Sequence, residues 1–206
     1  MVFSGTFAYA ESNKPEQKIA KVTINEYLMI KELKNKSDSE LQKMVFSAKD
    51  IGKIRNFDYA EELYRRSKLD DSILKNLGYT DEQISMLRAF SGTEEEIIAL
   101  AATLNISAKT DSYYYSEANN RTYYRARFDW NWSTAPAVMM EDIIGIAWSE
   151  GMYIDQSPNA TYHRVKYVNN IYGNYYYENA AIEPIAPGGG AETKFDMCKM
   201  YGQDRQ

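Results

Sequence analysis

The sequence YYRARFDWNW at residues 123–132 alternates between aromatic or small side chains and polar ones. Successive side chains of a β-strand point to opposite faces, so a period of two residues is typical of a strand with one buried face. One face would carry Tyr124, Ala126, Phe128, Trp130 and Trp132, and the other Tyr123, Arg125, Arg127, Asp129 and Asn131. We therefore predict a half-buried strand here, in a tyrosine-rich β region that follows residue 105.

Further short strands are expected on both sides of this stretch. They are residues 113–115, the apolar run 143–148 (buried on both faces), the alternating stretch 161–168, and residues 175–177 and 194–198. Turn-forming residues separate several of them, at 157–159, 169–170 and 187–190. Short strands divided by such turns indicate an antiparallel sandwich or a curled sheet.

The residues before 105 have a helical pattern instead. From Glu16 onward, apolar residues recur at three- and four-residue spacing, although the β-branched cluster 22–24 weakens the pattern locally. Later helices are expected to begin at Ser37, Asp58, Thr80 and Thr93, each of which has Glu or Gln three residues on. Another short helix would open at Asp70 or Asp71 and stop at Gly78. The predicted fold class is α+β, an N-terminal bundle of short helices followed by an antiparallel, tyrosine-rich β-sheet or sandwich domain.

This contrast predicts the domain organisation. Residues 11–105 would form the helical domain and residues 106–201 the β domain, with a disordered tail at 202–206. The join would fall at residues 105–111, which contain neither Gly nor Pro, so an ordered junction and a flexible linker are both open.

One segment of the helical half resembles a known family. Leu77-Gly78-Tyr79-Thr80, followed by Ile84, Leu87, Gly92-Thr93 and the apolar stretch 97–104, is similar to the glycine–aromatic loop and following helices of ubiquitin-associated three-helix domains. The similarity covers about thirty residues. Short helical hairpins also share Gly stops and Thr caps, which is the alternative explanation.

Length and charge exclude several classes of protein. The chain has 206 residues and a formal net charge of -5, which argues against nucleic acid as a main partner because phosphate binding needs clustered Lys and Arg. No apolar run approaches the roughly 18–20 residues of a membrane-spanning helix. Cys198 is the only cysteine, so no internal disulfide forms.

The first ten residues indicate export. Small residues Ala8 and Ala10 follow an apolar stretch and precede a polar segment, a pattern typical of the end of a signal peptide. We therefore expect residues 1–10 to be the remnant of a signal peptide and the protein to be extracellular or on the cell surface. An ordinary chain terminus is the alternative.

Candidate catalytic residues are few and no motif joins them. His163 is the only histidine and falls on the same strand face as Val165 and Tyr167, so it would be either a general base or a packed residue. Carboxylates in the β half, among them Asp129, Asp142 and Glu150, could act as a hydrolytic pair if they met in one cleft, or they could be solvated. No metal site or cofactor is expected.

The tyrosines are the strongest unusual feature. Tyrosine offers a large, rigid contact surface with a polar tip. Consecutive tyrosines on a strand point both ways, so some of them must face solvent or a partner unless they pair within the sheet. The candidate binding residues are Tyr123, Tyr162, Tyr175, Tyr176 and Tyr177.

These observations favour one function over two others. The leading hypothesis is an exported, non-catalytic protein that binds a protein, a glycan or cell-envelope material through its aromatic-rich sheet. The layout is similar to that of exported proteins of Gram-positive bacteria. A secreted hydrolase and a membrane-active, toxin-like or bacteriocin-like protein are the alternatives.

Overall fold

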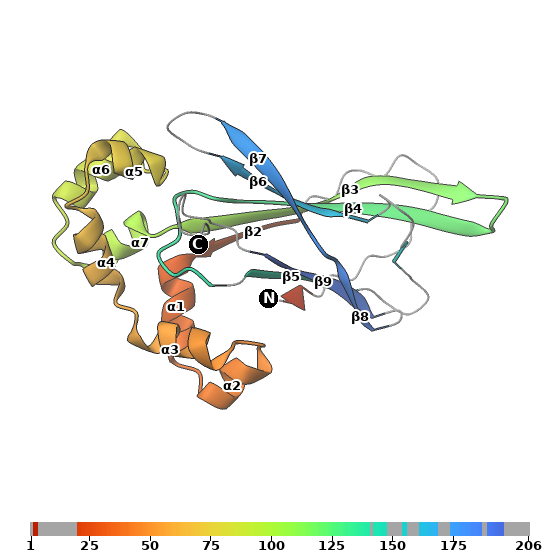
Figure 1. Cartoon of the computed structure of the whole chain (residues 1–206), viewed down its shortest axis with the longest axis horizontal. Helices are drawn as coiled ribbons and strands as arrows, with labels where there is room; N and C mark the ends of the chain where they lie inside the picture. Colours follow the sequence, from red (N-terminus) through yellow and green to blue (C-terminus); the bar gives the residue numbers. More distant parts are fainter. Residues whose placement is uncertain are drawn as a thin grey trace, which may run out of the picture. The chain divides into compact units, whose positions relative to one another are not determined.

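The computed structural model has the predicted α+β fold, with short helices followed by antiparallel strands (Figure 1). It describes residues 2–3, 20–140, 142–147, 154–155, 161–168, 174–186 and 189–195. The chain divides into two compact units. We name each after the β-hairpin that it contains and describe each by itself.

The long-hairpin unit comprises Ala10–Lys36 and Phe57–Ala137. Its three strands, in the order β2-β3-β4, form an antiparallel sheet. Strands β3 and β4 are the long hairpin. The elements are β2 (Ala20–Asn25), α1 (Glu26–Lys34), α4 (Tyr59–Arg66), α5 (Asp71–Asn76), α6 (Asp81–Arg88), α7 (Glu94–Leu100), β3 (Thr103–Ser116) and β4 (Arg121–Trp132).

The predicted helix caps are confirmed. Thr80 and Thr93 each form a reciprocal capping box, with Gln83 at the start of α6 and with Glu96 at the start of α7. The Asp58 side chain accepts a hydrogen bond from the backbone N–H of Glu61 in the first turn of α4. Gly78 follows α5 with a positive φ of 91°, a conformation in which other residues are strained.

The expectation of a helix from Glu16 is wrong for residues 20–25, which form β2. This strand pairs with the first half of β3, where Val22 lies opposite Ile106 and Ile24 opposite Leu104. The β-branched side chains of this stretch fit a sheet better than a helix, and the pairing with β3 decides the outcome. The helix α1 begins only at Glu26.

Two buried polar residues, Glu26 and Arg66, join the helices to the chain beyond β4. Glu26, of which 1% is exposed, accepts a hydrogen bond from the Tyr59 hydroxyl at 2.6 Å through Oε2. The backbone N–H of Ala137 donates to both carboxylate oxygens, at 2.9 and 2.8 Å. A buried charge is costly unless it is hydrogen-bonded, so these donors fix Glu26 and the chain after β4 together.

Arg66 holds the same segment from the end of α4. Its guanidinium donates to the carbonyl oxygens of Ala135, at 2.9 Å, and Pro136, at 3.1 Å. It also donates to the Tyr79 hydroxyl at 3.0 Å and to Glu62 at 2.7 Å. Residues 135–137 are thus held to the helices by one acidic and one basic side chain.

An apolar cluster surrounds these polar contacts. It forms the core of the helices and contains Tyr59, Leu63, Leu74, Tyr79, Ile84, Leu87, Ile97, Leu100 and Ala101. Ile97, Leu100 and Ala101 belong to the apolar stretch 97–104 of the sequence, whereas the burial of Glu26 was not expected.

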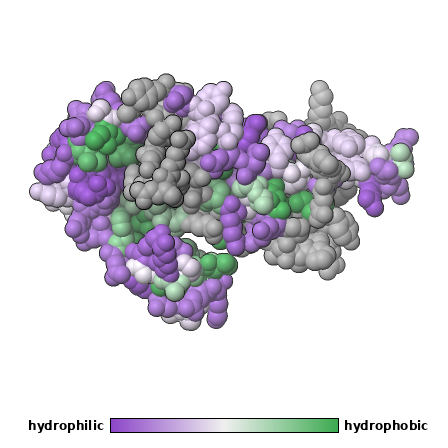
Figure 2. Space-filling view, in the orientation of Figure 1, coloured by the Kyte–Doolittle hydropathy of each residue, from purple (hydrophilic) through white to green (hydrophobic). Residues whose placement is uncertain are grey.

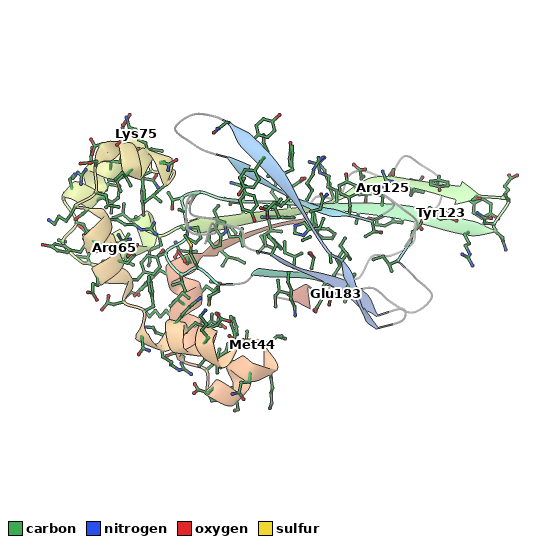
Figure 3. The ribbon with its side chains drawn as sticks, viewed as in Figure 1. Met44, Arg65, Lys75, Tyr123, Arg125 and Glu183 are labelled. Carbon is green, nitrogen blue, oxygen red and sulfur yellow. The ribbon has the colours of Figure 1, made fainter. Side chains whose placement is uncertain are left out.

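The long hairpin extends far beyond its buried base. Residues 105–111, expected as the domain join, lie inside β3 and are ordered as a strand. The predicted strand 123–132 is confirmed within β4. On its apolar face, only the residues from Phe128 onward are half-buried, while Tyr124 is 48% exposed. Pale and deep purple side chains predominate at the turn end of the hairpin (Figure 2), where Tyr123 and Arg125 project from β4 (Figure 3).

The short-hairpin unit comprises Met1–Tyr9, Ser37–Asn56 and Val138–Gln206. One sheet has the order β1-β5-β9-β8, with β1 parallel to β5 and the other pairs antiparallel, and β6 and β7 form a separate two-stranded sheet, the short hairpin. The elements are β1 (Val2–Phe3), α2 (Asp38–Lys43), α3 (Ala48–Asn56), β5 (Asp142–Ala147), β6 (His163–Val168), β7 (Tyr175–Ala180), β8 (Glu183–Ala186) and β9 (Gly190–Phe195).

Several predictions for this unit have mixed outcomes. Ser37 forms the expected capping box with Glu40 at the start of α2. The strand expected at 143–148 is present as β5, but residues 143–146 are half-buried and not buried on both faces. Strand β9 begins earlier than expected, at Gly190, and residues 196–198 lie outside the described residues. That residues 11–105 and 106–201 fold as separate domains stays a prediction. The signal peptide at residues 1–10 also stays a prediction.

The Glu26 contacts give a first testable prediction. Glu26→Ala leaves the Tyr59 hydroxyl and the Ala137 N–H buried without their acceptor, so the free energy of unfolding should fall by about 3–5 kcal/mol. Urea unfolding followed by circular dichroism measures this change. The matched control is Glu32→Ala on the exposed side of α1, which should change stability by less than about 1 kcal/mol. Equal effects of the two substitutions would contradict the role assigned to Glu26.

Candidate functional site

The short hairpin separates its side chains into an inner and an outer face. Antiparallel pairing places Lys166 opposite Tyr177, and Val168 opposite Tyr175. Residues directly opposite each other share a face. The outer face therefore carries Arg164, Lys166, Tyr175, Tyr177 and Asn179, and the inner face carries His163, Val165, Tyr167, Tyr176, Glu178 and Ala180.

The outer face combines exposed aromatic rings with cations. The Arg164 guanidinium lies 4.4 Å from the ring centroid of Tyr177, and the Lys166 ammonium lies 4.1 Å from that of Tyr175. The two rings meet edge to face at 5.5 Å. Tyr175 is 57% exposed and Tyr177 is 47% exposed. Each cation–π contact contributes about 0.5–1 kcal/mol at an exposed site, which is enough to bias the side chains toward this arrangement.

The β6 side of the inner face is buried and holds His163, as the strand pattern predicts. Val165 and Tyr167 are buried beside it, and Tyr167 stacks on Tyr176 at 5.1 Å between centroids. The His163 Nδ1 lies 2.8 Å from the Thr193 hydroxyl of β9, and its ring meets Phe195 at 4.3 Å. Burial lowers the pKa of His163 below its ordinary value. The histidine thus packs the short hairpin against β9.

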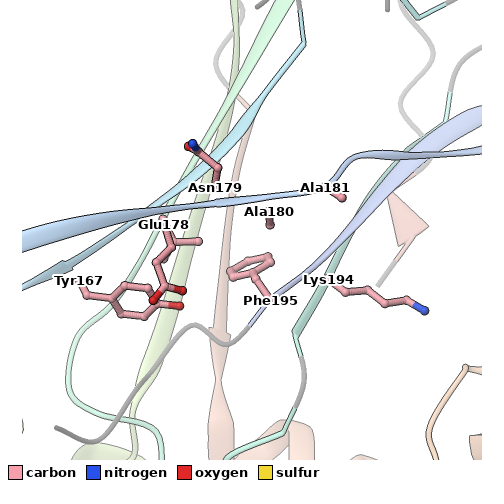
Figure 4. Close-up of a pocket in the computed structure, with 8 residues that line it drawn as sticks. Tyr167, Glu178, Asn179, Ala180, Ala181, Lys194 and Phe195 are labelled. Carbon is pink, nitrogen blue, oxygen red and sulfur yellow. The ribbon is translucent and has the colours of Figure 1, made fainter. Parts of the chain in front are cut away.

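A cavity of about 270 Å³ opens beside this inner face. Figure 4 shows Glu178 next to the Tyr167 side chain, Phe195 in the middle of the lining, and the Lys194 side chain extending away from that pair. The remaining lining is Val165, Asn179, Ala180 and Ala181. The carboxylate of Glu178 and the ammonium of Lys194 point in different directions in this view (Figure 4).

The other two candidate tyrosines lie elsewhere in the molecule. Tyr162, which is 66% exposed, comes just before β6 in the short-hairpin unit. Tyr123 belongs to the long-hairpin unit, is half-buried, and stacks on Tyr114 with 4.9 Å between ring centroids. Tyr176 is 42% exposed but faces inward. The five candidates therefore do not make one patch, and only Tyr175 and Tyr177 are shown in direct ring contact with each other.

The candidate catalytic carboxylates are not brought together by the described contacts. Asp129 lies in the long-hairpin unit, where it accepts a hydrogen bond from Arg127 at 2.7 Å and lies 3.5 Å from the Lys109 ammonium. Asp142 is a backbone partner of Phe195 in the other unit. Glu150 lies outside the described residues. Among the residues with described side chains, no three His, Cys, Asp or Glu lie close enough to hold a metal ion.

Sequence reasoning missed the cations that accompany the tyrosines. The alternation of residues 161–168 places Arg164 and Lys166 on the face opposite His163, Val165 and Tyr167. The alternation that places them outward also places them on the face of Tyr175 and Tyr177, once the register is known. The missing information was the register of β6 against β7, which 161–168 and 175–177 alone do not fix.

Comparison with known proteins adds no further assignment. No protein-family model, curated protein or solved structure matches the chain. None of the described helices is long and apolar enough to cross a bilayer.

The lowered pKa of His163 gives a prediction with a definite sign. A histidine whose folded-state pKa lies below its unfolded value binds protons more readily when unfolded, so its contribution to stability is present above about pH 6.5 and lost as the pH falls. Between pH 7.5 and pH 5.5 the wild-type chain should therefore lose more stability than His163→Gln. Thermal unfolding at both pH values measures this difference. An equal loss in both proteins would show that His163 is not held in its neutral form.

Proposed function

We propose that this protein is an exported, non-catalytic binding protein whose short hairpin contacts a macromolecular partner at a cell envelope. The observation that carries the proposal is the outer face of β6 and β7, where Tyr175 and Tyr177 are exposed and in contact with Lys166 and Arg164. A protein, a glycan or other envelope material could serve as the partner of such a face.

The composition of this face suits binding. Tyrosine contributes large contact area with only two side-chain torsions, so little conformational entropy is lost when it is immobilised. The cation–π contacts and the edge-to-face contact of Tyr175 with Tyr177 order the rings before a partner arrives. Tyrosine and arginine are also the residues that most often dominate binding energy at interfaces.

A core role explains this face less well than a binding role. Tyr167 on the inner face is buried against Tyr176, so the inner face already supplies the aromatic packing of the short hairpin. Tyr175 and Tyr177 are 57% and 47% exposed, whereas Tyr167, the buried ring of the inner stack, is 9% exposed. We infer that their main contribution lies in contacts with another molecule.

The test uses the double substitution Tyr175→Ser and Tyr177→Ser. It removes both outer rings and leaves the inner stack of Tyr167 on Tyr176 in place. Retention on washed cell-wall material from a Gram-positive bacterium should fall about tenfold or more, because hot-spot aromatic residues each contribute about 2 kcal/mol or more. Sedimentation of the bound protein with the wall material measures the retention.

The control removes two other exposed tyrosines, Tyr113 and Tyr115 of the long hairpin, by the same substitution to serine. This control should be retained like the wild type. Circular dichroism of both variants checks that the fold is intact. Unchanged retention of the Tyr175→Ser, Tyr177→Ser protein would count decisively against the short hairpin as the binding face.

A further inference from the structure

The sheet of the long-hairpin unit has a polar face that the sequence alone does not reveal. A β-bulge between Thr110 and Ser112 adds one residue to β3 and changes which side chains share a face. Before the bulge the polar face takes Asn105, Ser107 and Lys109, and after it Ser112, Tyr114 and Ser116. From β4 it takes Arg121, Tyr123, Arg125, Arg127, Asp129 and Asn131, and from β2 it takes Lys21 and Thr23.

The charge on this face is strongly biased. Its charged side chains at paired positions are Lys21, Lys109, Arg121, Arg125, Arg127 and Asp129, and the exposed Asp111 occupies the bulge itself, so five cations share this part of the sheet with two carboxylates. Asp129 is engaged by Arg127 and Lys109. Neither Arg121 nor Arg125 has a carboxylate within ion-pair distance among the described residues, and both are exposed. A chain of net charge -5 thus concentrates cations on one sheet face.

The cations form a row rather than a cluster. Arg121, Arg125 and Arg127 all lie on β4, where alternate residues are about 6.4–6.8 Å apart along the strand. Guanidinium groups offer paired donors that match carboxylate, sulfate and phosphate groups. A row of this kind fits an extended polymer with repeated anionic groups better than it fits a single small anion.

The tyrosines of the face argue against a nucleic acid as that polymer. Single-stranded nucleic acids are held by aromatic rings whose faces are free to stack on bases. Here the rings of Tyr114 and Tyr123 stack on each other, 4.9 Å apart and inclined by only 10°. The Tyr123 hydroxyl also accepts a hydrogen bond from Asn119 at 3.2 Å, which further fixes the ring. One face of each ring is thus covered by the other ring, which leaves less aromatic surface for stacking on bases.

The side chains beside the cations suit a hydroxyl-rich chain. Ser107, Ser112 and Ser116 lie on β3 directly opposite Asp129, Arg125 and Arg121 of β4. Serine and asparagine supply adaptable hydrogen bonds, and none of the paired residues of this face in β2, β3 and β4 is aliphatic, unlike the apolar anchors that dominate protein interfaces. Both features match a hydrated sugar polymer.

We propose that the polar face of β2, β3 and β4 binds an acidic polysaccharide, in which carboxylate, sulfate or phosphate groups of the sugar chain lie along Arg121 and Arg125, beside the ion pair of Arg127 with Asp129. This surface is separate from the outer face of the short hairpin. Its assignment therefore does not depend on the binding role proposed for Tyr175 and Tyr177.

The experiment measures binding of the full chain to defined polymers. Polygalacturonate and dextran sulfate are the anionic probes, unmodified dextran is the neutral control, and poly(dT) represents nucleic acid. We expect binding to at least one anionic polysaccharide, which identifies the preferred anionic group, and no binding to dextran. Affinity should fall as salt rises from 50 to 300 mM, because the screening length for exposed charges shortens from about 13 Å to about 6 Å over this range.

Two double variants locate the site. Arg121→Gln with Arg125→Gln should weaken binding about tenfold or more, since it removes two charge-assisted contacts and no internal ion pair. Lys43→Gln with Lys49→Gln removes the same charge from exposed positions of the short-hairpin unit and should change affinity less than about threefold. Tighter binding to poly(dT) than to either acidic polysaccharide, no binding to either, or equal loss in the two variants would each overturn the proposal.

Discussion

The buried carboxylate of Glu26 is the constraint on which the long-hairpin unit depends. Only 1% of Glu26 is exposed, so its carboxylate needs hydrogen-bond donors within the protein. The Tyr59 hydroxyl and the Ala137 N–H supply them. Burial and the neighbouring carboxylate raise the pKa of Tyr59, so its hydroxyl stays protonated and remains a donor. The contacts join the first residue of α1 to α4 and to the chain that leaves β4.

This arrangement explains how a long hairpin extends so far without a core of its own. Its base is anchored twice, once by Glu26 and once by Arg66, which holds the carbonyl oxygens of Ala135 and Pro136. Beyond Phe128, toward the turn, both faces of the hairpin are largely exposed. Stability is therefore supplied at the base, and the residues near the turn are released from packing requirements. Exposed cations on such a ribbon also oppose edge-to-edge association with other chains.

The sequence predicts what depends on local interactions. The capping boxes at Thr80 and Thr93 and the left-handed stop at Gly78 follow from side chains within a few residues of one another, and they are confirmed. The residues 20–25 were assigned to a helix because their strand partner, β3, lies about eighty residues away. The burial of Glu26 depends on Ala137, which is 111 residues distant.

The candidate surfaces were predictable only in part for the same reason. A strand of consecutive tyrosines must expose some of them, and the exposure of Tyr175 and Tyr177 agrees with that expectation. Which cations share their face depends on the register of β6 with β7. The row of arginines on β4 is visible in the sequence, but its pairing with serines and with Tyr114 depends on the bulge at Thr110 and Ser112.

Outward-facing tyrosines of the two hairpins are presented to solvent, while the inward-facing Tyr167 and the tyrosines of the helical core are buried. Nitration by tetranitromethane, mapped by peptide mass spectrometry, tests it on the native chain. We predict early modification of Tyr113, Tyr115, Tyr162, Tyr175 and Tyr177, and protection of Tyr59, Tyr79 and Tyr167, which are buried. Protection of the hairpin tyrosines to the same extent as the core tyrosines would contradict the account.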